Sequence, residues 1–267
     1  MSTGIVIFFL ATGCAGGFLA GLLGVGGGIL FVPCLHFGFV TFGLSSDLAF
    51  LMAVGTSLAI IVVTALSSAL GHAFHGALTR REVFAMATLA VPGSLAGAAV
   101  AQYLGGDLLR KLFGIFLFYV AYRFFKPTAI AQASDGGNLS FPKLAGVGGA
   151  SGLFSAILGV GGGLLTVPLL NLVLKVPMRK AVANSSGLIV FTAIGGAAGW
   201  IYSGWEEEGL PPHSFGYVNA VAWALISFTS VLFAQLGAWT ASRMRPEGLA
   251  KPFAAVLCLV GIKMIFF

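Results

Sequence analysis

Charged residues are scarce in this sequence. Of its 267 residues, 8% are Asp, Glu, Lys or Arg and 58% are hydrophobic, and the mean hydropathy is +1.01. A soluble domain carries about 25% charged residues, so the composition excludes a soluble globular protein. Six long stretches contain no charge at all: 1–46, 48–79, 83–106, 144–174, 181–205 and 209–242. A membrane-spanning helix needs about 20 such residues, and we therefore predict an all-α integral membrane protein.

Cysteine and histidine are also scarce. The three cysteines, Cys14, Cys34 and Cys258, lie in apolar runs without a Cys-x-x-Cys pair, so no disulfide framework is expected. The four histidines and eight carboxylates are scattered, and no nucleophile lies in a pattern with a base. We expect no metal, no cofactor and no enzymatic activity. No run of Lys and Arg is long enough to bind nucleic acid, so the expected partners are a small anion and the lipid bilayer, with homo-oligomerisation left open.

Glycine, in contrast, is abundant and forms part of a repeat. Residues 17–35 read GFLAGLLGVGGGILFVPCL, and residues 152–170 read GLFSAILGVGGGLLTVPLL. In both copies a Gly-Val-Gly-Gly-Gly run interrupts an apolar segment, and a proline (Pro33 or Pro168) follows. Glycine-broken apolar segments at corresponding positions indicate a membrane protein of two related halves, with its site where the halves meet.

The apolar segments predict about eight transmembrane helices in two homologous four-helix halves. The segments are 4–40 (broken at 24–28), 48–70, 82–104, 108–126, 142–173 (broken at 159–163), 180–202, 214–241 and 249–267. The polar stretch 127–141, PTAIAQASDGGNLSF, has the composition of a linker. It separates an N-terminal transmembrane repeat, 1–126, from a C-terminal transmembrane repeat, 142–267.

The relative orientation of the halves depends on the broken segments. If each crosses the membrane once, a half has four spans and the copies are parallel. If each folds back into two crossings, a half has five spans and the copies are inverted. Residues 29–40 form about 18 Å of helix, which is short of the hydrocarbon core of about 30 Å and fits a re-entrant half-helix. We favour four spans per half.

The distribution of basic residues then predicts the orientation in the membrane. With eight spans, one set of loops holds Arg110, Lys111, Lys175, Arg179, Lys180, Arg243, Arg245 and Lys251. The other set holds Arg80, Arg81, Lys126 and Lys143, with the acidic Glu206, Glu207 and Glu208. Cytoplasmic loops are the richer in Lys and Arg, so the first set is expected in the cytoplasm and both termini outside.

The glycine runs are the first candidate site. A helix that begins after each break directs free N–H groups and a partial positive charge back into the gap, which makes an anion site without a charged side chain. Irregular backbone at membrane depth persists only beside protein or a water-filled cavity. The alternative is close helix packing through small residues. The residues assigned to this anion site are Gly26, Gly27, Gly28, Gly161, Gly162 and Gly163.

Polar residues at matched positions are the second candidate. Thr56 and Ser57 correspond to Asn184 and Ser185, and Ser186 follows. Their hydroxyl and amide groups can donate hydrogen bonds to an oxyanion, so we expect them in the substrate site. The alternative is a bond to a neighbouring helix or to the residue's own helix.

Three ionisable residues are candidates for an electrostatic or proton-coupling role: His36, Arg123 and Lys263. Charge at membrane depth is costly and often functional, whereas residues near helix ends extend to the interface. His36 can titrate near neutral pH, but Asn171 stands at its counterpart.

At these motifs the chain resembles the TauE/SafE family of sulfite exporters. The resemblance rests on 24–28 with Pro33, 159–163 with Pro168, 55–57 and 183–187, and it covers essentially the whole chain. It implies a secondary carrier in the cytoplasmic membrane that exports sulfite or sulfonates such as sulfoacetate, driven by the proton motive force or the membrane potential. The absence of a Gly-x-x-x-x-Gly-Lys-[Ser/Thr] loop agrees with transport without ATP. The alternatives are a passive anion or small-molecule channel and, less favoured, a membrane-embedded enzyme.

Overall fold

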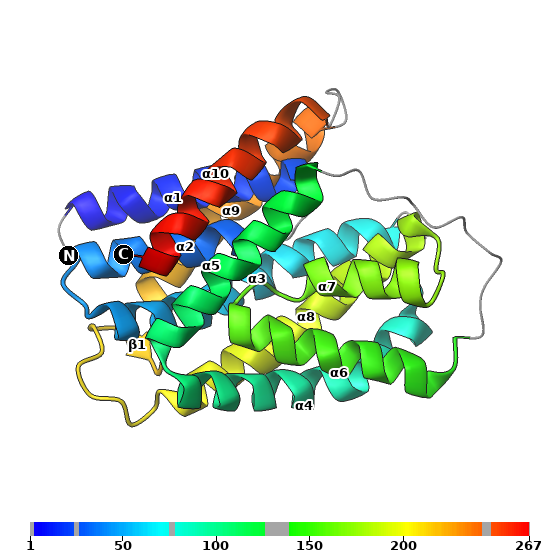
Figure 1. Cartoon of the computed structure of the whole chain (residues 1–267), viewed down its shortest axis with the longest axis horizontal. Helices are drawn as coiled ribbons and strands as arrows, with labels where there is room; N and C mark the ends of the chain where they lie inside the picture. The colour runs from blue at the N-terminus through cyan, green and yellow to red at the C-terminus, as the bar shows by residue number, and fades with distance from the viewer. Residues whose placement is uncertain (1–2, 24–26, 75–77, 126–138, 242–246, 267) are drawn as a thin grey trace.

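The computed structural model describes residues 3–23, 27–74, 78–125, 139–241 and 247–266, and within them the chain is almost entirely helical (Figure 1). The first half contains α1 (Thr3–Leu23), α2 (Gly28–Thr41), α3 (Ser46–Phe74), α4 (Arg80–Leu104) and α5 (Gly106–Phe125). The second half contains α6 (Phe141–Leu158), α7 (Gly163–Pro168), the π-helix η1 (Leu169–Val173), α8 (Met178–Ser203), α9 (Ala220–Ala241) and α10 (Glu247–Phe266). A short antiparallel hairpin, β1 (Ser214–Phe215) and β2 (Val218–Asn219), precedes α9.

Six of the described helices are long and apolar enough to cross a membrane: α1, α3, α4, α6, α8 and α9. This finding supports the predicted all-helical, multi-pass membrane protein. The predicted number of eight spans is not confirmed. Gly28–Thr41 and Gly163–Val173 are shorter apolar helices, and they are the parts that follow the two glycine breaks.

Each broken segment folds back on itself instead of continuing in one direction. The Phe8 ring of α1 contacts Phe42 beyond the end of α2, whereas Gly16, further along α1, lies against Phe31 near the start of α2. The two helices are therefore antiparallel. In the second half, the hydroxyls of Thr166 in α7 and Ser151 in α6 share a hydrogen bond of 2.9 Å. Within the described residues each half thus has five α-helices, with η1 continuing α7, and the favoured four spans per half are not confirmed.

Glycines in the left-handed backbone conformation allow the chain to reverse its direction at each break. Gly27 has φ 73°, and Gly159, Gly161 and Gly162 have φ between 70° and 82°. L-residues with a side chain rarely adopt this conformation, whereas glycine adopts it freely. A helix that meets such residues ends, and the chain then starts a new helix in another direction.

Equivalent helices of the two halves run antiparallel. Along the contact between α3 and α8, Gly55 lies beside Trp200, whereas Leu58, further along α3, lies beside Gly196, which comes earlier in α8. Between α5 and α10, Arg110 hydrogen-bonds the Met264 carbonyl, whereas the later Gly114 lies against the earlier Gly261. The repeat is therefore inverted, an arrangement that many secondary transporters use.

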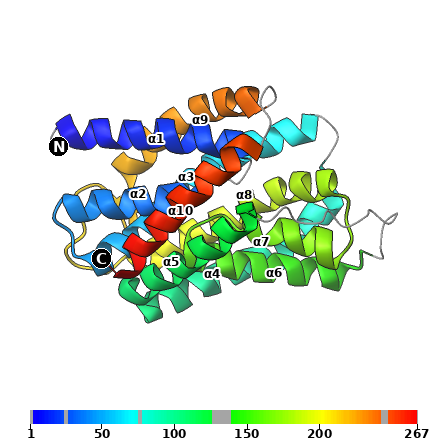
Figure 2. The ribbon, with the colours of Figure 1, turned by 45° about the horizontal axis from the view of Figure 1, so that its top comes forward.

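The halves also exchange their first helices. α1 packs along α9 of the second half, and α6 packs along α4 of the first half (Figure 2). Glycines allow both contacts. A Cβ atom at Gly148 of α6 would lie 1.9 Å from the Met86 carbonyl oxygen, and one at Gly21 of α1 would lie 2.0 Å from the Ala234 carbonyl oxygen. Small residues let helix backbones approach closely in membranes.

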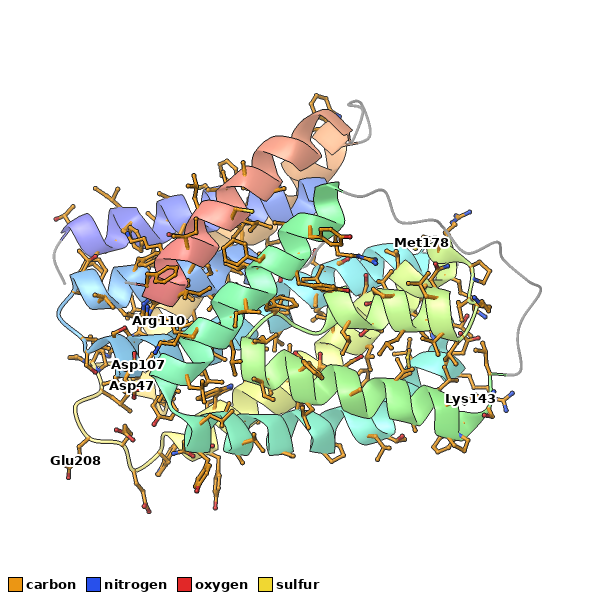
Figure 3. All side chains as sticks on the ribbon, viewed as in Figure 1. Asp47, Asp107, Arg110, Lys143, Met178 and Glu208 are labelled. Carbon is orange, nitrogen blue, oxygen red and sulfur yellow. The ribbon has the colours of Figure 1, made fainter. Side chains whose placement is uncertain are left out.

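The two ends of the helix bundle carry different charges (Figure 3). Among the described side chains, the end at the starts of α4, α6 and α8 has Arg80, Arg81, Arg123, Lys143, Lys175, Arg179, Lys180 and Glu82. We call it the basic end. The opposite end, the acidic end, has Asp47, Asp107, Glu206, Glu207, Glu208, Arg110, Lys111 and Lys263. The predicted loop sets need correction, because the folded-back segments place Arg110 and Lys111 opposite Lys175, Arg179 and Lys180.

Candidate functional site

The two glycine breaks meet in the interior of the protein. A Cβ atom at Gly28 would lie 2.7 Å from Val160 Cα and 2.8 Å from the Gly159 carbonyl oxygen. We call residues 27–28 and 159–163 the glycine junction. Gly26, which was assigned to the same site, lies outside the described residues.

Two short helices leave the glycine junction in opposite directions. The Gly27 carbonyl accepts the amides of Leu30 and Phe31, and the Gly162 carbonyl accepts those of Leu165 and Thr166. The amides that precede these have no acceptor within their helix, so both helix starts present donors and partial positive charge at the junction. From there α2 leads to the acidic end and α7 with η1 to the basic end (Figure 1).

Hydroxyl groups hold the second break in place. Ser57 Oγ of α3 donates to the Gly159 carbonyl at 2.8 Å, and Thr192 Oγ1 of α8 donates to the Gly161 carbonyl at 3.0 Å. Thr166 Oγ1 donates to the Gly162 carbonyl at 2.9 Å. Of these three residues, only Ser57 was predicted from the sequence. The repeated Ile-Val-x-Thr-Ala motif at 61–65 and 189–193 was the available signal for Thr192.

Two other hydroxyls at the junction have no hydrogen-bond partner within the part of the chain that the structure describes. Ser185 is 2% exposed and Ser155 is 1% exposed, and the Oγ atom of each makes no hydrogen bond. A Cβ atom at Gly163 would lie 3.6 Å from Ser185 Oγ, and one at Gly162 would lie 3.4 Å from Ser155 Cβ. An unsatisfied buried polar group costs about 1–3 kcal/mol. Both hydroxyls therefore favour a ligand or water at this place.

Thr56 and Asn184, predicted beside these serines, bind elsewhere. Thr56 Oγ1 accepts the Asn219 amide at 3.0 Å, and Asn184 Oδ1 accepts the Thr79 amide at 2.8 Å. Thr56 thus connects α3 to the start of α9, and Asn184 connects α8 to the start of α4. Ser186 Oγ donates to the Val182 carbonyl of its own helix at 3.1 Å. These three contacts are of the kind expected under the alternative, in which the side chain bonds to a neighbouring helix or to its own helix.

The acidic end is covered by the hairpin, in which Tyr217 is central. Tyr217 packs edge-on against Trp200, with ring centroids 5.5 Å apart. Its hydroxyl donates to Glu207 Oε2 at 2.9 Å. Burial, together with this bond to a carboxylate, raises the pKa of Tyr217 above its ordinary value. The phenol therefore stays neutral and keeps its hydrogen bond at neutral pH.

The three predicted ionisable residues do not gather at the junction. His36 is buried in α2 beside the Phe37 and Phe50 rings, and among the described residues its Nδ1 has no hydrogen-bond partner. Lys263 Nζ lies 4.2 Å from the centroid of the Phe37 ring, in contact with the same helix. Arg123 is half-buried near the end of α5, at the basic end. Their functional role stays a prediction.

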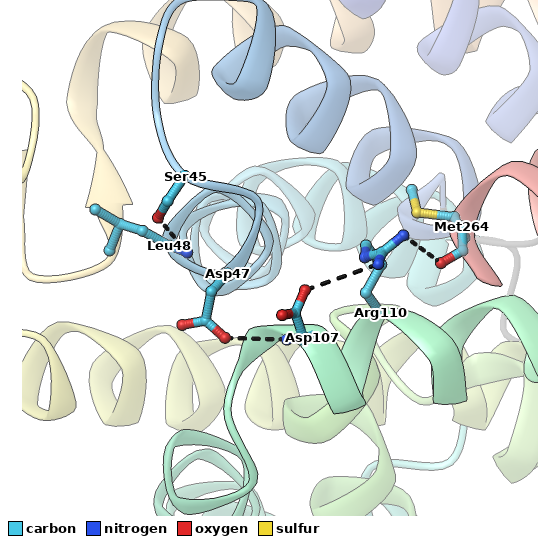
Figure 4. A network of polar contacts seen from close by, with 6 residues as sticks. All are labelled: Ser45, Asp47, Leu48, Asp107, Arg110 and Met264. Carbon is cyan, nitrogen blue, oxygen red and sulfur yellow. Dashed lines mark hydrogen bonds and ion pairs between the residues drawn. The ribbon is translucent and has the colours of Figure 1, made fainter. Parts of the chain in front are cut away.

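A polar network that sequence reasoning missed connects helices at the acidic end (Figure 4). Asp47 Oδ1 of α3 accepts the Asp107 amide of α5 at 3.0 Å. Arg110, which is 8% exposed, lies 3.7 Å from Asp107 and donates to the Met264 carbonyl of α10 at 2.8 Å. Asp47 thus connects α3 to α5, and Arg110 connects α5 to α10. Within the described ranges, no group of three or more His, Cys, Asp or Glu residues is placed to hold a metal ion.

An inverted repeat of helices around a broken-helix junction defines a membrane transport protein. The model of the family described as "Sulfite exporter TauE/SafE" matches residues 9–264, and the chain belongs to this family. It is 30% identical to the probable membrane transporter protein MJ0441 of Methanocaldococcus jannaschii, over 93% of this chain and 91% of the relative. It is 29% identical to a probable membrane transporter protein of Haemophilus influenzae, over 97% of both chains. No solved structure matches it.

Proposed function

We propose that this membrane transporter is a secondary carrier that exports small sulfur oxyanions, sulfite or sulfonates such as sulfoacetate, across the cytoplasmic membrane. The observation that carries the proposal is the glycine junction, where two helix starts meet beside unpartnered Ser155 and Ser185. Amides and hydroxyls of this kind bind an anion through its oxygens. The family model, which is named for sulfite export, supports this class of substrate.

Neutral donors also suit release of the anion. The seven residues of the glycine junction include no charged side chain. Release of the anion from the junction therefore does not require breaking an ion pair with the protein. Export of one negative charge from an inside-negative cell is favourable by about 2.3 kcal/mol per 100 mV. The membrane potential or a proton gradient therefore supplies the driving force. The inverted repeat supports a carrier with alternating access over a passive channel. Saturable flux with counterflow of labelled sulfite in proteoliposomes tests this choice, and ohmic single-channel currents would contradict it.

The charge asymmetry of the bundle supports an orientation. The basic end has seven described Lys and Arg residues against three at the acidic end: Arg80, Arg81, Arg123, Lys143, Lys175, Arg179 and Lys180 against Arg110, Lys111 and Lys263. Cytoplasmic segments are enriched in Lys and Arg, so the basic end faces the cytoplasm. The N-terminal end of α1 and the C-terminal end of α10 lie at the acidic end (Figure 1), and both termini therefore face outward.

Protease accessibility checks this orientation. A cleavable tag added before Met1 or after Phe267 is expected to be cut by protease added to intact spheroplasts. The same tag inserted into the segment 127–138, between α5 and α6, is expected to be cut only after the membrane is opened. Protection of the terminal tags in intact spheroplasts would place the basic end outside.

Replacement of Ser185 by alanine is expected to reduce sulfite flux about tenfold and leave the unfolding temperature nearly unchanged. The Oγ atom of Ser185 has no protein partner, so its loss breaks no internal hydrogen bond, whereas one charge-assisted bond to substrate contributes about 1.5–3 kcal/mol. Flux into proteoliposomes and thermal unfolding measure the two quantities. Ser186→Ala is the matched control, because Ser186 bonds only to its own helix. Equal flux in both variants and wild type would remove Ser185 from the site.

A further inference from the structure

At the basic end, the carboxylate of Glu82 is bound by two side chains of the opposite half. Lys180 Nζ donates to Glu82 Oε1, and Asn184 Nδ2 donates to Glu82 Oε2 at 2.6 Å. The Glu82 side chain is 12% exposed and that of Lys180 is 36% exposed. Glu82 belongs to the first turn of α4, whereas both donors belong to the first two turns of α8. One carboxylate therefore uses both of its oxygens to connect the two halves.

We propose that Lys180 and Asn184 form the entry site for the substrate anion, and that the Glu82 carboxylate occupies this site until an oxyanion displaces it. The proposal rests on the function proposed above, since it assigns a second station to the same substrate. It explains why a carboxylate in a chain with so few charges has both oxygens bound by one ammonium and one amide.

The chemistry of the two anions makes the exchange feasible. A carboxylate, a sulfite and a sulfonate each present at least two oxygens that share negative charge and accept hydrogen bonds. The Lys180 ammonium and the Asn184 amide donate to such a pair without recognising the central atom. When one anion replaces the other, Lys180 keeps a counterion, and the displaced Glu82 carboxylate borders the cavity that Arg81 also lines.

A cavity at the basic end borders the Glu82 side of this site. It has a volume of about 490 Å³ and is lined by Arg81 and Glu82 together with apolar side chains that include Phe84 and Phe141. The Arg81 side chain is exposed and makes no hydrogen bond or ion pair within the described residues. An anion that approaches from the cytoplasm therefore meets a free guanidinium first and the Glu82 position next.

The entry site also lies next to the glycine junction along α8. Asn184 is followed in α8 by Ser185, the unpartnered serine beside Gly163. Successive residues of a helix point about 100° apart, so one turn of α8 presents Asn184 to the basic end and Ser185 to the junction. The two proposed stations therefore lie on adjacent residues of one helix.

Anion binding by the full-length protein tests the proposal. Sulfite, sulfoacetate, sulfate and chloride are added to purified protein, with thermal stabilisation as the readout, and sulfite flux is measured in proteoliposomes. Glu82→Gln removes the competing charge and is expected to lower the half-saturating sulfite concentration about tenfold, because occupied sites reduce apparent affinity. Lys180→Gln is expected to raise that concentration about tenfold, whereas Lys180→Arg keeps it within about twofold of wild type. Arg179→Gln, an exposed residue of the same turn, is the control and is expected to match wild type.

The outcomes separate this inference from the proposed function. If wild type transports sulfite and neither Glu82→Gln nor Lys180→Gln changes the half-saturating concentration, the entry site is wrong and the carrier stands. If wild type binds no sulfur oxyanion but binds another anion through Lys180, the entry site stands and the proposed substrate is wrong. If Glu82→Gln does not yield folded protein, the comparison of Lys180→Gln with Lys180→Arg decides, and equal affinities in these two would overturn the entry site.

Discussion

Leucine at position 28 is expected to abolish transport and to lower the unfolding temperature strongly. The first atom of the new side chain would lie 2.7 Å from Val160 Cα and 2.8 Å from the Gly159 carbonyl oxygen. These atoms belong to the backbone, which cannot rotate out of the way as a side chain can. The two glycine breaks must therefore separate, and overpacking of this kind costs about 1–3 kcal/mol or more. Sulfite flux in proteoliposomes and thermal unfolding in detergent measure the effect.

Two further variants test whether the loss of transport and stability in Gly28→Leu comes from contact between the two glycine breaks. Gly146→Leu is the control, because a Cβ atom at Gly146 meets nothing within 4 Å, and it is expected to behave as wild type. Gly28→Ala adds only the first atom and is expected to lie between wild type and Gly28→Leu in both measurements. Wild-type flux in Gly28→Leu would show that transport does not depend on contact between the two breaks.

The double replacement Ser57→Ala with Thr192→Val is expected to give the next largest loss, about 2–5 kcal/mol in the free energy of unfolding. It removes the hydroxyls that bind the carbonyls of Gly159 and Gly161. These carbonyls lie in a non-helical segment within the protein, and a buried acceptor without a partner costs about 1–3 kcal/mol. Unfolding by denaturant in mixed micelles measures the change.

Thr64→Val provides the control for this double variant. Thr64 occupies the position in α3 that corresponds to Thr192 in the repeat, but its hydroxyl bonds only to the Ile60 and Ile61 carbonyls of its own helix. Those carbonyls keep their helical partners, so the loss is expected to stay below about 1 kcal/mol. A loss as large as that of the double variant would mean that hydroxyls in these helices contribute alike, whatever they contact.

The helix positions could be predicted from the sequence because charges bound the apolar runs. The predicted segment 180–202 is the helix Met178–Ser203, and 82–104 is Arg80–Leu104. The direction of the chain after each glycine break could not be predicted. A run of 12 residues such as 29–40 fits both a re-entrant helix and part of a crossing, and the choice depends on φ angles at glycines and on contacts between the halves.

The positions of the candidate site residues could be predicted only in part, for a geometric reason, and their role in binding substrate stays a prediction. The sequence places Thr56 beside Ser57 and Asn184 beside Ser185, but neighbouring residues of a helix point about 100° apart. The structure places the two serines at the glycine junction and directs Thr56 and Asn184 to the starts of α9 and α4. Glu82 was missed because a charge at the start of a helix resembles a topology signal, and its partner Lys180 lies 98 residues away in the sequence.

The exchange of first helices between the halves has a consequence for biosynthesis. α1 enters the membrane at the start of translation, but its main packing partner is α9, which begins at Ala220. At about 5–20 residues per second, the ribosome needs on the order of 10–40 seconds to supply that partner. Until then the glycine-lined face of α1, which includes Gly13, Gly17 and Gly21, lacks the helix that covers it in the folded protein. α1 therefore gains its main packing partner only after nearly the whole chain has been synthesised.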